Sequence, residues 1–172
     1  MLQNLSIEKI KIFENEFKQF MGIKDFPAYQ LTTKEVSLAI ADSCGFDSAA
    51  STFYSPKTNI HTLQISTNLI LSKYLVFHEF THILDADMYA NGDSTKYAGL
   101  SGYTEYHASQ IELMQLLGTK TATDKISFEM NTIISTFSGD KSVAQYIREK
   151  QEHAIQLFSR ADFPADINTL KS

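Results

Sequence analysis

The chain has 172 residues, a net charge of -5, and 43% hydrophobic and 20% charged residues. This composition is typical of an ordinary globular protein and excludes disordered and fibrous classes, and the length predicts a single domain, 1–172. Lys and Arg total only 15 and form no basic cluster, so we expect no direct binding to nucleic acid.

The N-terminal segment "MLQNLSIEKIKIFENEF" carries charges at Glu8, Lys9, Lys11 and Glu14, which interrupt any apolar core of a signal peptide. No later run approaches about 18 apolar residues, the length that predicts a membrane span. The single cysteine, Cys44, cannot form an internal disulfide. We therefore expect a cytoplasmic protein that does not enter a membrane.

Two helices are predicted before residue 46. The first begins after Ser6 and ends at Gly22, because apolar residues recur at intervals of three and four. In the second, "TKEVSLAIADS", Thr32 and Glu35 match a capping box and Gly45 ends the helix. The apolar residues of the first helix are Ile10, Phe13, Phe17 and Phe20.

The middle of the chain predicts a β-hairpin followed by a long helix. The segments "SAASTFY" and "NIHTLQIS" are rich in β-branched and aromatic residues and are joined by "SPKT". Asn68 is the expected N-cap of the helix "LILSKYLVFHEFTHILDADMYA", and Asn91-Gly92 its end. We expect an α+β fold that is predominantly helical, with a small antiparallel sheet beside this helix.

The remainder is predicted to be a loop and further helices. The polar, glycine-containing segment "GDSTKYAGLSG" is expected to be a loop bordering a cleft, with a helix resuming around Thr104 and ending at Gly118. Two amphipathic helices are predicted within residues 124–160.

The long helix contains His78, Glu79 and His82 in the pattern H-E-x-x-H. Residues four apart lie on one face of a helix, so the two imidazoles can bind one ion. Zinc suits such nitrogens, and a catalytic zinc site has three protein ligands and an open position for water. Glu79 is the expected general base, accepting a proton from the zinc-bound water.

The alternative is a helix with one glutamate and two incidental histidines. The segments "YLVF" before the motif and "IL" after it make the helix apolar. Burying unpaired His and Glu side chains there would be costly, and a metal ion removes that cost.

The third ligand has to come from outside the motif. The metzincin pattern does not fit, because Asp85 and Met88 stand where its glycine and last histidine should be. We expect Glu105 instead, near the start of a downstream helix whose dipole favours an anion. Glu112 and His107 in the same helix are the alternatives, although His107 points about 200° away from Glu105.

Several other side chains have possible roles. Asp85 can orient a histidine or be solvated. If His107 is not a ligand, it can donate a hydrogen bond to an oxyanion. The tyrosines considered as oxyanion stabilisers are Tyr74, Tyr103 and Tyr106; His61 and His153 are expected to be structural or solvated. The strand "IHTLQIS" is expected to be an edge strand that pairs with an extended substrate.

Residues 30–118 resemble the gluzincin-type zincin metallopeptidases, and are most similar to the small ImmA/IrrE-like family. In that family H-E-x-x-H is followed by a helix with E-x-x-A-x-x-[apolar], positions that Glu105, Ala108 and Ile111 occupy here. The resemblance implies His78, His82 and Glu105 as zinc ligands and Glu79 as general base. It also implies limited proteolysis of a protein partner, in some members a repressor of a phage or mobile element.

The sequence therefore predicts a zinc-dependent metallopeptidase acting on a protein or peptide. Two alternatives remain. The first is a protein-binding module that keeps the zincin fold with little or no peptidase activity, and the second is a zinc hydrolase acting on a small amide. The hairpin edge favours a peptide substrate.

Overall fold

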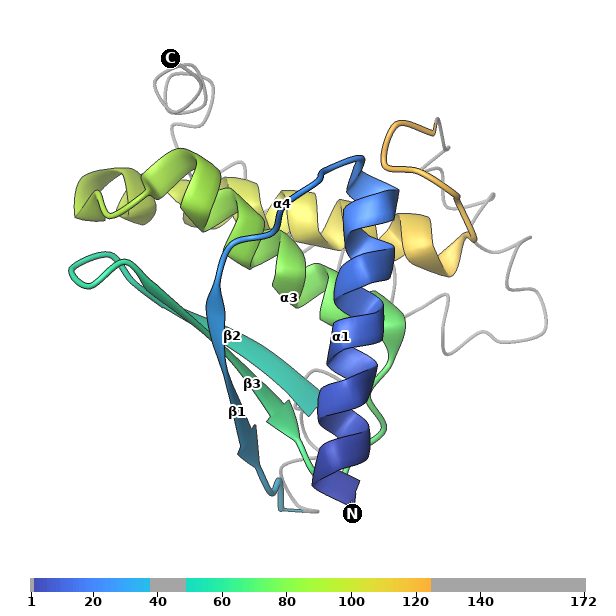
Figure 1. Cartoon of the computed structure of the whole chain (residues 1–172). Helices are drawn as coiled ribbons and strands as arrows, with labels where there is room; N and C mark the ends of the chain where they lie inside the picture. The colour runs from blue at the N-terminus through green and yellow to red at the C-terminus, as the bar shows by residue number, and fades with distance from the viewer. Residues whose placement is uncertain (1, 38–48, 125–172) are drawn as a thin grey trace.

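The computed structural model describes residues 2–37 and 49–124, which form an α+β fold (Figure 1). The predicted helices from residue 125 onward, and Cys44, lie outside the described residues. Within those two ranges, none of the helices combines the length and apolar character needed to cross a membrane. The elements in chain order are α1 (Leu2–Met21), β1 (Tyr29–Lys34), β2 (Ala50–Ser55), β3 (Ile60–Ser66), α3 (Lys73–Asp85), the π-helical η2 (Ala86–Ala90) and α4 (Ser94–Leu116).

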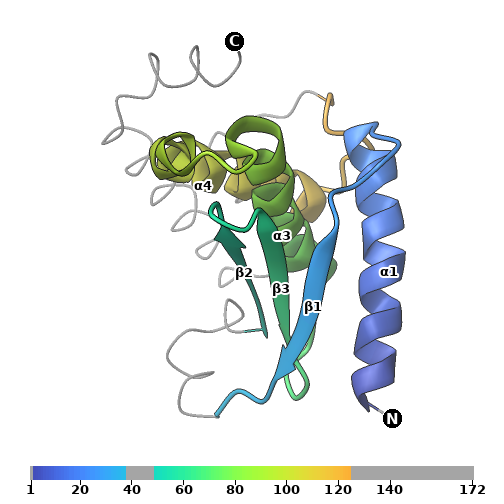
Figure 2. The same ribbon diagram turned by 60° about the vertical axis from the view of Figure 1, so that its left-hand side comes forward.

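The sheet has the strand order β1-β3-β2. The predicted hairpin is confirmed, since β2 and β3 pair antiparallel with Tyr54 opposite His61. Our expectation of a purely antiparallel sheet was wrong, because β1 pairs parallel to the other side of β3. The strand "IHTLQIS" is therefore the central strand and not an edge. Figure 2 shows β1 and β2 at the two edges of the described sheet, and β2 is the edge strand that packs against α3.

The capping-box prediction at Thr32 and Glu35 was wrong. Thr32 and Thr33 lie within β1, where they are aligned with Gln64 and Ile65 of β3. A capping box is a local signal, whereas this strand is held by a partner some thirty residues further along the chain, so tertiary pairing overrides the local preference. The rest of the predicted helix, from residue 38, lies outside the described residues.

Helix α1 begins at Leu2, earlier than the predicted start after Ser6, and ends as predicted at Met21, directly before Gly22, which has a φ of +69°. Its Phe17 ring lies 5.2 Å from Phe77 and 5.4 Å from Phe80 of α3, measured between ring centroids. Phe26 lies 5.6 Å from Phe17 and 5.1 Å from Phe80. This aromatic cluster fixes which face of α3 turns toward α1 and into the core.

Helix α3 begins four residues later than predicted, with Ser72 and not Asn68 at its N-cap position. The side chain of Asn68 instead accepts a hydrogen bond from the Val36 backbone N–H and donates one to the Val36 carbonyl, joining two chain segments. The predicted end is confirmed: Asn91 is left-handed, with a φ of 43°, directly after η2. The motif H-E-x-x-H lies inside α3, among residues that are mostly buried.

Helix α4 begins ten residues before the predicted position, so the expected loop at 92–102 was wrong. Asp93 caps the helix, because its carboxylate accepts hydrogen bonds from the backbone N–H groups of Thr95 and Lys96 at 2.9 and 3.0 Å. Leu100 is fully buried and attaches the first part of the helix to the core. Glu105 consequently lies in the middle of α4, and the helix-dipole argument for that residue does not apply.

Candidate metal centre

Helices α3 and α4 pack against each other and bring three donor side chains together. His78 Nε2 and His82 Nε2 are 3.1 Å apart. The Glu105 carboxylate lies 3.5 Å from His78 Nε2 and 3.4 Å from His82 Nε2. These side chains can each offer one ligand atom to a metal ion, with all three atoms within 4.8 Å of one another. We refer to His78, His82 and Glu105 as the three-donor group.

The donor separations match the dimensions of a tetrahedral zinc site. Ligand atoms about 2.0–2.1 Å from a tetrahedral zinc ion lie roughly 3.3–3.4 Å from one another. The two imidazole nitrogens are 3.1 Å apart, and Glu105 presents a different oxygen to each ring, Oε1 at 3.5 Å from His78 Nε2 and Oε2 at 3.4 Å from His82 Nε2. Two imidazoles and one carboxylate are also donors that zinc accepts in catalytic sites. Both the geometry and the chemistry of the group fit this ion.

The second nitrogen of each imidazole has a partner on α4. His78 Nδ1 lies 2.9 Å from the buried Glu112 carboxylate, and His82 Nδ1 lies 2.8 Å from the Thr104 hydroxyl. An ionised carboxylate can only accept, so Nδ1 of His78 donates and, in the neutral ring, Nε2 carries the lone pair. If His82 likewise donates from Nδ1 to Thr104, the lone pairs of both Nε2 atoms point toward the Glu105 carboxylate. A cation between these three groups would remove the repulsion among them.

Glu112, our alternative third ligand, thus contacts His78 at Nδ1, the ring nitrogen that faces away from the three-donor group. Its seven-residue spacing from Glu105 places both carboxylates on one face of α4, as the sequence predicts. Glu105 reaches the Nε2 atoms and Glu112 reaches Nδ1. The structure therefore gives Glu112 the geometry of a residue that orients a ligand.

The charges around His78 favour a cation. Burial by itself lowers the pKa of His78, but the hydrogen bond to Glu112 and the charges of Glu79, Glu112 and Glu105 together raise it above its ordinary value. A divalent ion at the three-donor group would be attracted by the same carboxylates. A proton and a metal ion would therefore compete for this position, as is general for histidine ligands.

Glu79 is held beside the three-donor group by the sheet. It is largely buried, and its carboxylate accepts a 2.8 Å hydrogen bond from the Thr52 hydroxyl of β2. No sequence signal linked Thr52 to this glutamate, because the contact depends on how β2 packs on α3. The bond fixes one carboxylate oxygen and leaves the other for a different partner.

His107 lies outside the three-donor group. Its Nδ1 is 2.9 Å from the carboxylate of Asp85, which is almost fully buried, and its ring stacks on Tyr103 at 5.5 Å. Asp85 thus contacts a histidine, but one that is not in the group. Burial and a hydrogen bond to Tyr89 raise the pKa of Tyr103, so that side chain is engaged in this neighbouring cluster.

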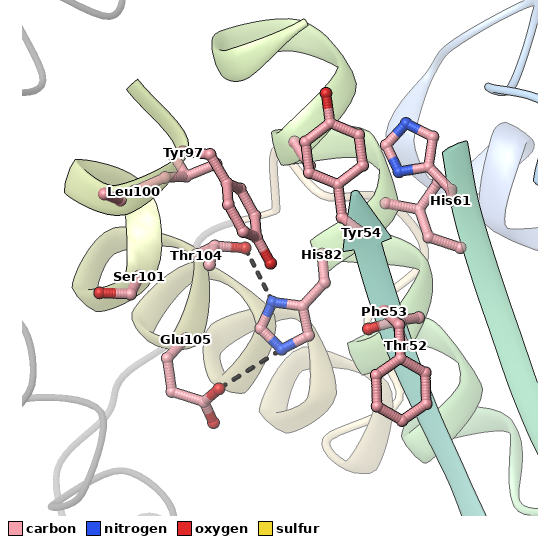
Figure 3. A pocket seen from close by; sticks show the side chains of 13 residues that line it. Thr52, Phe53, Tyr54, His61, His82, Tyr97, Leu100, Ser101, Thr104 and Glu105 are labelled. Carbon is pink, nitrogen blue, oxygen red and sulfur yellow. Dashed lines mark hydrogen bonds and ion pairs between the residues drawn. The ribbon is translucent and has the colours of Figure 1, made fainter. Parts of the chain in front are cut away.

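A tyrosine that the sequence did not indicate lies beside the group. Figure 3 shows the Tyr97 hydroxyl pointing toward His82. Its ring packs edge-on against Tyr54 at 4.9 Å, and burial and Tyr54 raise its pKa, so it stays a hydrogen-bond donor. Tyr97 is seven residues before Thr104, two helical turns on the same face. The spacing is visible only once α4 is extended back to Ser94. Of the predicted tyrosines, Tyr74 packs against the core cluster, and neither it nor Tyr103 or Tyr106 lines the pocket with Tyr97.

A pocket of about 340 Å³ opens beside the three-donor group (Figure 3). His82 and Glu105 form one part of its lining, and Tyr54 and Tyr97 another. His61, expected to be structural or solvated, is buried and also lines it. His153 lies outside the described residues.

Comparison of the chain with protein-family models, with curated proteins and with solved structures found no match.

Proposed function

We propose that this protein is a zinc-dependent metallopeptidase that hydrolyses a peptide bond in a protein or peptide. The observation that carries the proposal is the convergence of three donor side chains, with contacts of 3.1–3.5 Å between the two Nε2 atoms and the Glu105 carboxylate and with the remaining nitrogen of each histidine bound by α4. Two histidines and a glutamate form the donor set of one class of zinc peptidases. The resemblance of residues 30–118 to the ImmA/IrrE-like family supports the same activity.

His78, His82 and Glu105 would hold the ion, with Glu112 and Thr104 orienting the imidazoles. When bound, zinc supplies Lewis acidity, which activates water and polarises a carbonyl. Glu79 accepts the proton of the attacking water and returns it to the leaving amine. Thr52 keeps the Glu79 carboxylate turned toward the sheet side of the site.

Tyr97 is the residue proposed to stabilise the oxyanion. Its hydroxyl points into the pocket toward His82, as a donor placed near the developing negative charge should (Figure 3). Packing against Tyr54 holds its ring in position. This role replaces the ones that the sequence suggested for Tyr74, Tyr103 and Tyr106.

An extended substrate would pair with β2 and not with β3. Strand β3 is paired on both sides, whereas β2 pairs only with β3 among the described strands. Thr52 and Phe53 of β2 line the pocket that contains His82 and Glu105. Backbone pairing along β2 would therefore bring a peptide bond to the three-donor group with little dependence on sequence.

The test compares the wild type with Glu79→Gln, which retains a hydrogen-bond acceptor for Thr52. We expect about one zinc per chain in both proteins by elemental analysis. Peptide N-termini generated in a cell lysate by the wild type should be absent with Glu79→Gln. Cleavage at the same bonds by the variant would contradict the proposed role of Glu79, and a cellular function that survives the substitution would favour a binding module.

A further inference from the structure

The pocket beside the three-donor group has a lining that selects among side chains. The rings of Tyr54 and Tyr97 form aromatic walls, and Leu100 and Ile83 contribute aliphatic surface. Its volume of about 340 Å³ is at the lower end of the range for ligand pockets, roughly 300–1,000 Å³. Aromatic walls of this kind favour an aromatic occupant, because aromatic rings prefer edge-on or offset contacts with one another.

His61 is an unexplained polar residue in this lining. Only 3% of its surface is exposed, and neither ring nitrogen has a hydrogen-bond partner among residues 2–37 and 49–124. The Asp87 carboxylate lies 3.9 Å from Nε2, too far for a hydrogen bond. The ring stacks on Tyr54 at 4.5 Å, and Figure 3 shows Tyr54 between His61 and Tyr97. Buried polar groups are rarely left without a partner, so a ligand group is the expected one.

The imidazole of His61 suits a hydroxyl. Burial lowers the pKa of His61 even though Asp87 acts in the opposite direction, so the ring is neutral near pH 7. One ring nitrogen then donates and the other accepts, and a hydroxyl can match either. A carboxylate side chain would instead meet the negative charges of Glu105 and Asp87.

We propose that this pocket binds a tyrosine side chain of the substrate, with the tyrosine hydroxyl hydrogen-bonded to His61. The position of this side chain next to the scissile bond rests on the proposed peptidase function. The preference for binding tyrosine does not rest on the peptidase function, because it depends only on the residues that line the pocket. His61 would be a specificity-determining residue, since a phenylalanine in the pocket leaves its nitrogens without a partner.

The binding test uses full-length, zinc-loaded Glu79→Gln and two probes, N-acetyl-L-tyrosinamide and N-acetyl-L-phenylalaninamide, titrated by NMR. We expect the tyrosine probe to bind about tenfold more tightly. Adding His61→Phe, which keeps a ring against Tyr54, should remove this difference, and His61→Gln should keep part of it. Equal binding of the two probes, binding of neither, or a preference that survives His61→Phe would each overturn the proposal.

The activity test uses the wild type and a peptide library prepared from a digested proteome. We expect tyrosine to be enriched at one position beside the cleaved bond, and the enrichment to shift to phenylalanine with His61→Phe. Cleavage without a tyrosine preference overturns the pocket assignment and leaves the peptidase proposal standing. Selective binding of the tyrosine probe without any cleavage supports the pocket assignment and contradicts the peptidase proposal.

Discussion

The two carboxylates of α4 should contribute very differently to zinc affinity. Glu112 contacts His78 Nδ1 at 2.9 Å, and residues that orient a ligand typically change metal affinity by about 10–100-fold. That factor corresponds to roughly 1.4–2.7 kcal/mol. Glu105 lies 3.4–3.5 Å from both Nε2 atoms, as a direct ligand should. Neutralising Glu105 resembles removing one partner of a buried charge pair, which costs ~3–5 kcal/mol. This cost corresponds to a loss of zinc affinity of roughly 1,000-fold.

We therefore predict that Glu105→Gln lowers zinc affinity at least tenfold more than Glu112→Gln does. The assay is competition for zinc with a chromophoric chelator at pH 7.5. Glu8→Gln, an exposed position on α1, serves as the matched control and should behave as the wild type. Thermal unfolding of the chelated proteins identifies any loss of folding. A larger effect at Glu112 would refute the assignment, because Glu112 would then be the third ligand.

Three further predictions concern the pocket and the core. Tyr97→Phe keeps the ring packed on Tyr54 and should lower kcat about 100-fold at unchanged zinc affinity; an unchanged kcat would exclude an oxyanion role. Phe80→Ala should lower the free energy of unfolding in urea by about 3–5 kcal/mol, whereas Phe53→Ala, 58% exposed, should change it by less than about 0.5 kcal/mol; similar losses would refute the core assignment. For His61, burial holds the folded-state pKa below its ordinary value of about 6.5, so between pH 7 and 5 the unfolded chain binds more protons and stability falls. In chelated protein His61→Phe should lose less stability than the wild type over this range, and urea curves that shift equally would contradict this sign.

The part of the site that follows helical geometry could be predicted from the sequence. The spacing of His78 and His82 places both rings on one face of any α-helix, and the seven residues from Glu105 to Glu112 do the same for two carboxylates. Which carboxylate meets which nitrogen depends on how far α4 is shifted along α3. That shift is a property of packing between helices, so the sequence left the choice between Glu105 and Glu112 open.

The errors have a common cause in contacts distant along the chain. The capping box at Thr32 is a sound local signal, but pairing with β3 makes that segment a strand. The glycines of 92–102 suggest a loop, but the buried Leu100 holds this segment against the core as a helix, which begins at the local cap formed by Asp93. This second error also concealed Tyr97, because a tyrosine in a loop has no predictable relation to Glu105.

The proposed metal site is built by two helices, whereas the proposed substrate pocket also draws on the sheet. The three-donor group and the residues that orient it come from α3 and α4 alone. The sheet contributes Thr52, which contacts Glu79, and the pocket residues Tyr54 and His61. Because distant substitutions act almost independently, changes in the sheet should alter substrate preference without altering zinc affinity. A change at Glu112, which does not line the pocket, should lower zinc affinity while the pocket keeps its shape. We therefore expect the proposed metal binding and substrate recognition to be separable by mutation, although His82 and Glu105 belong to both sites.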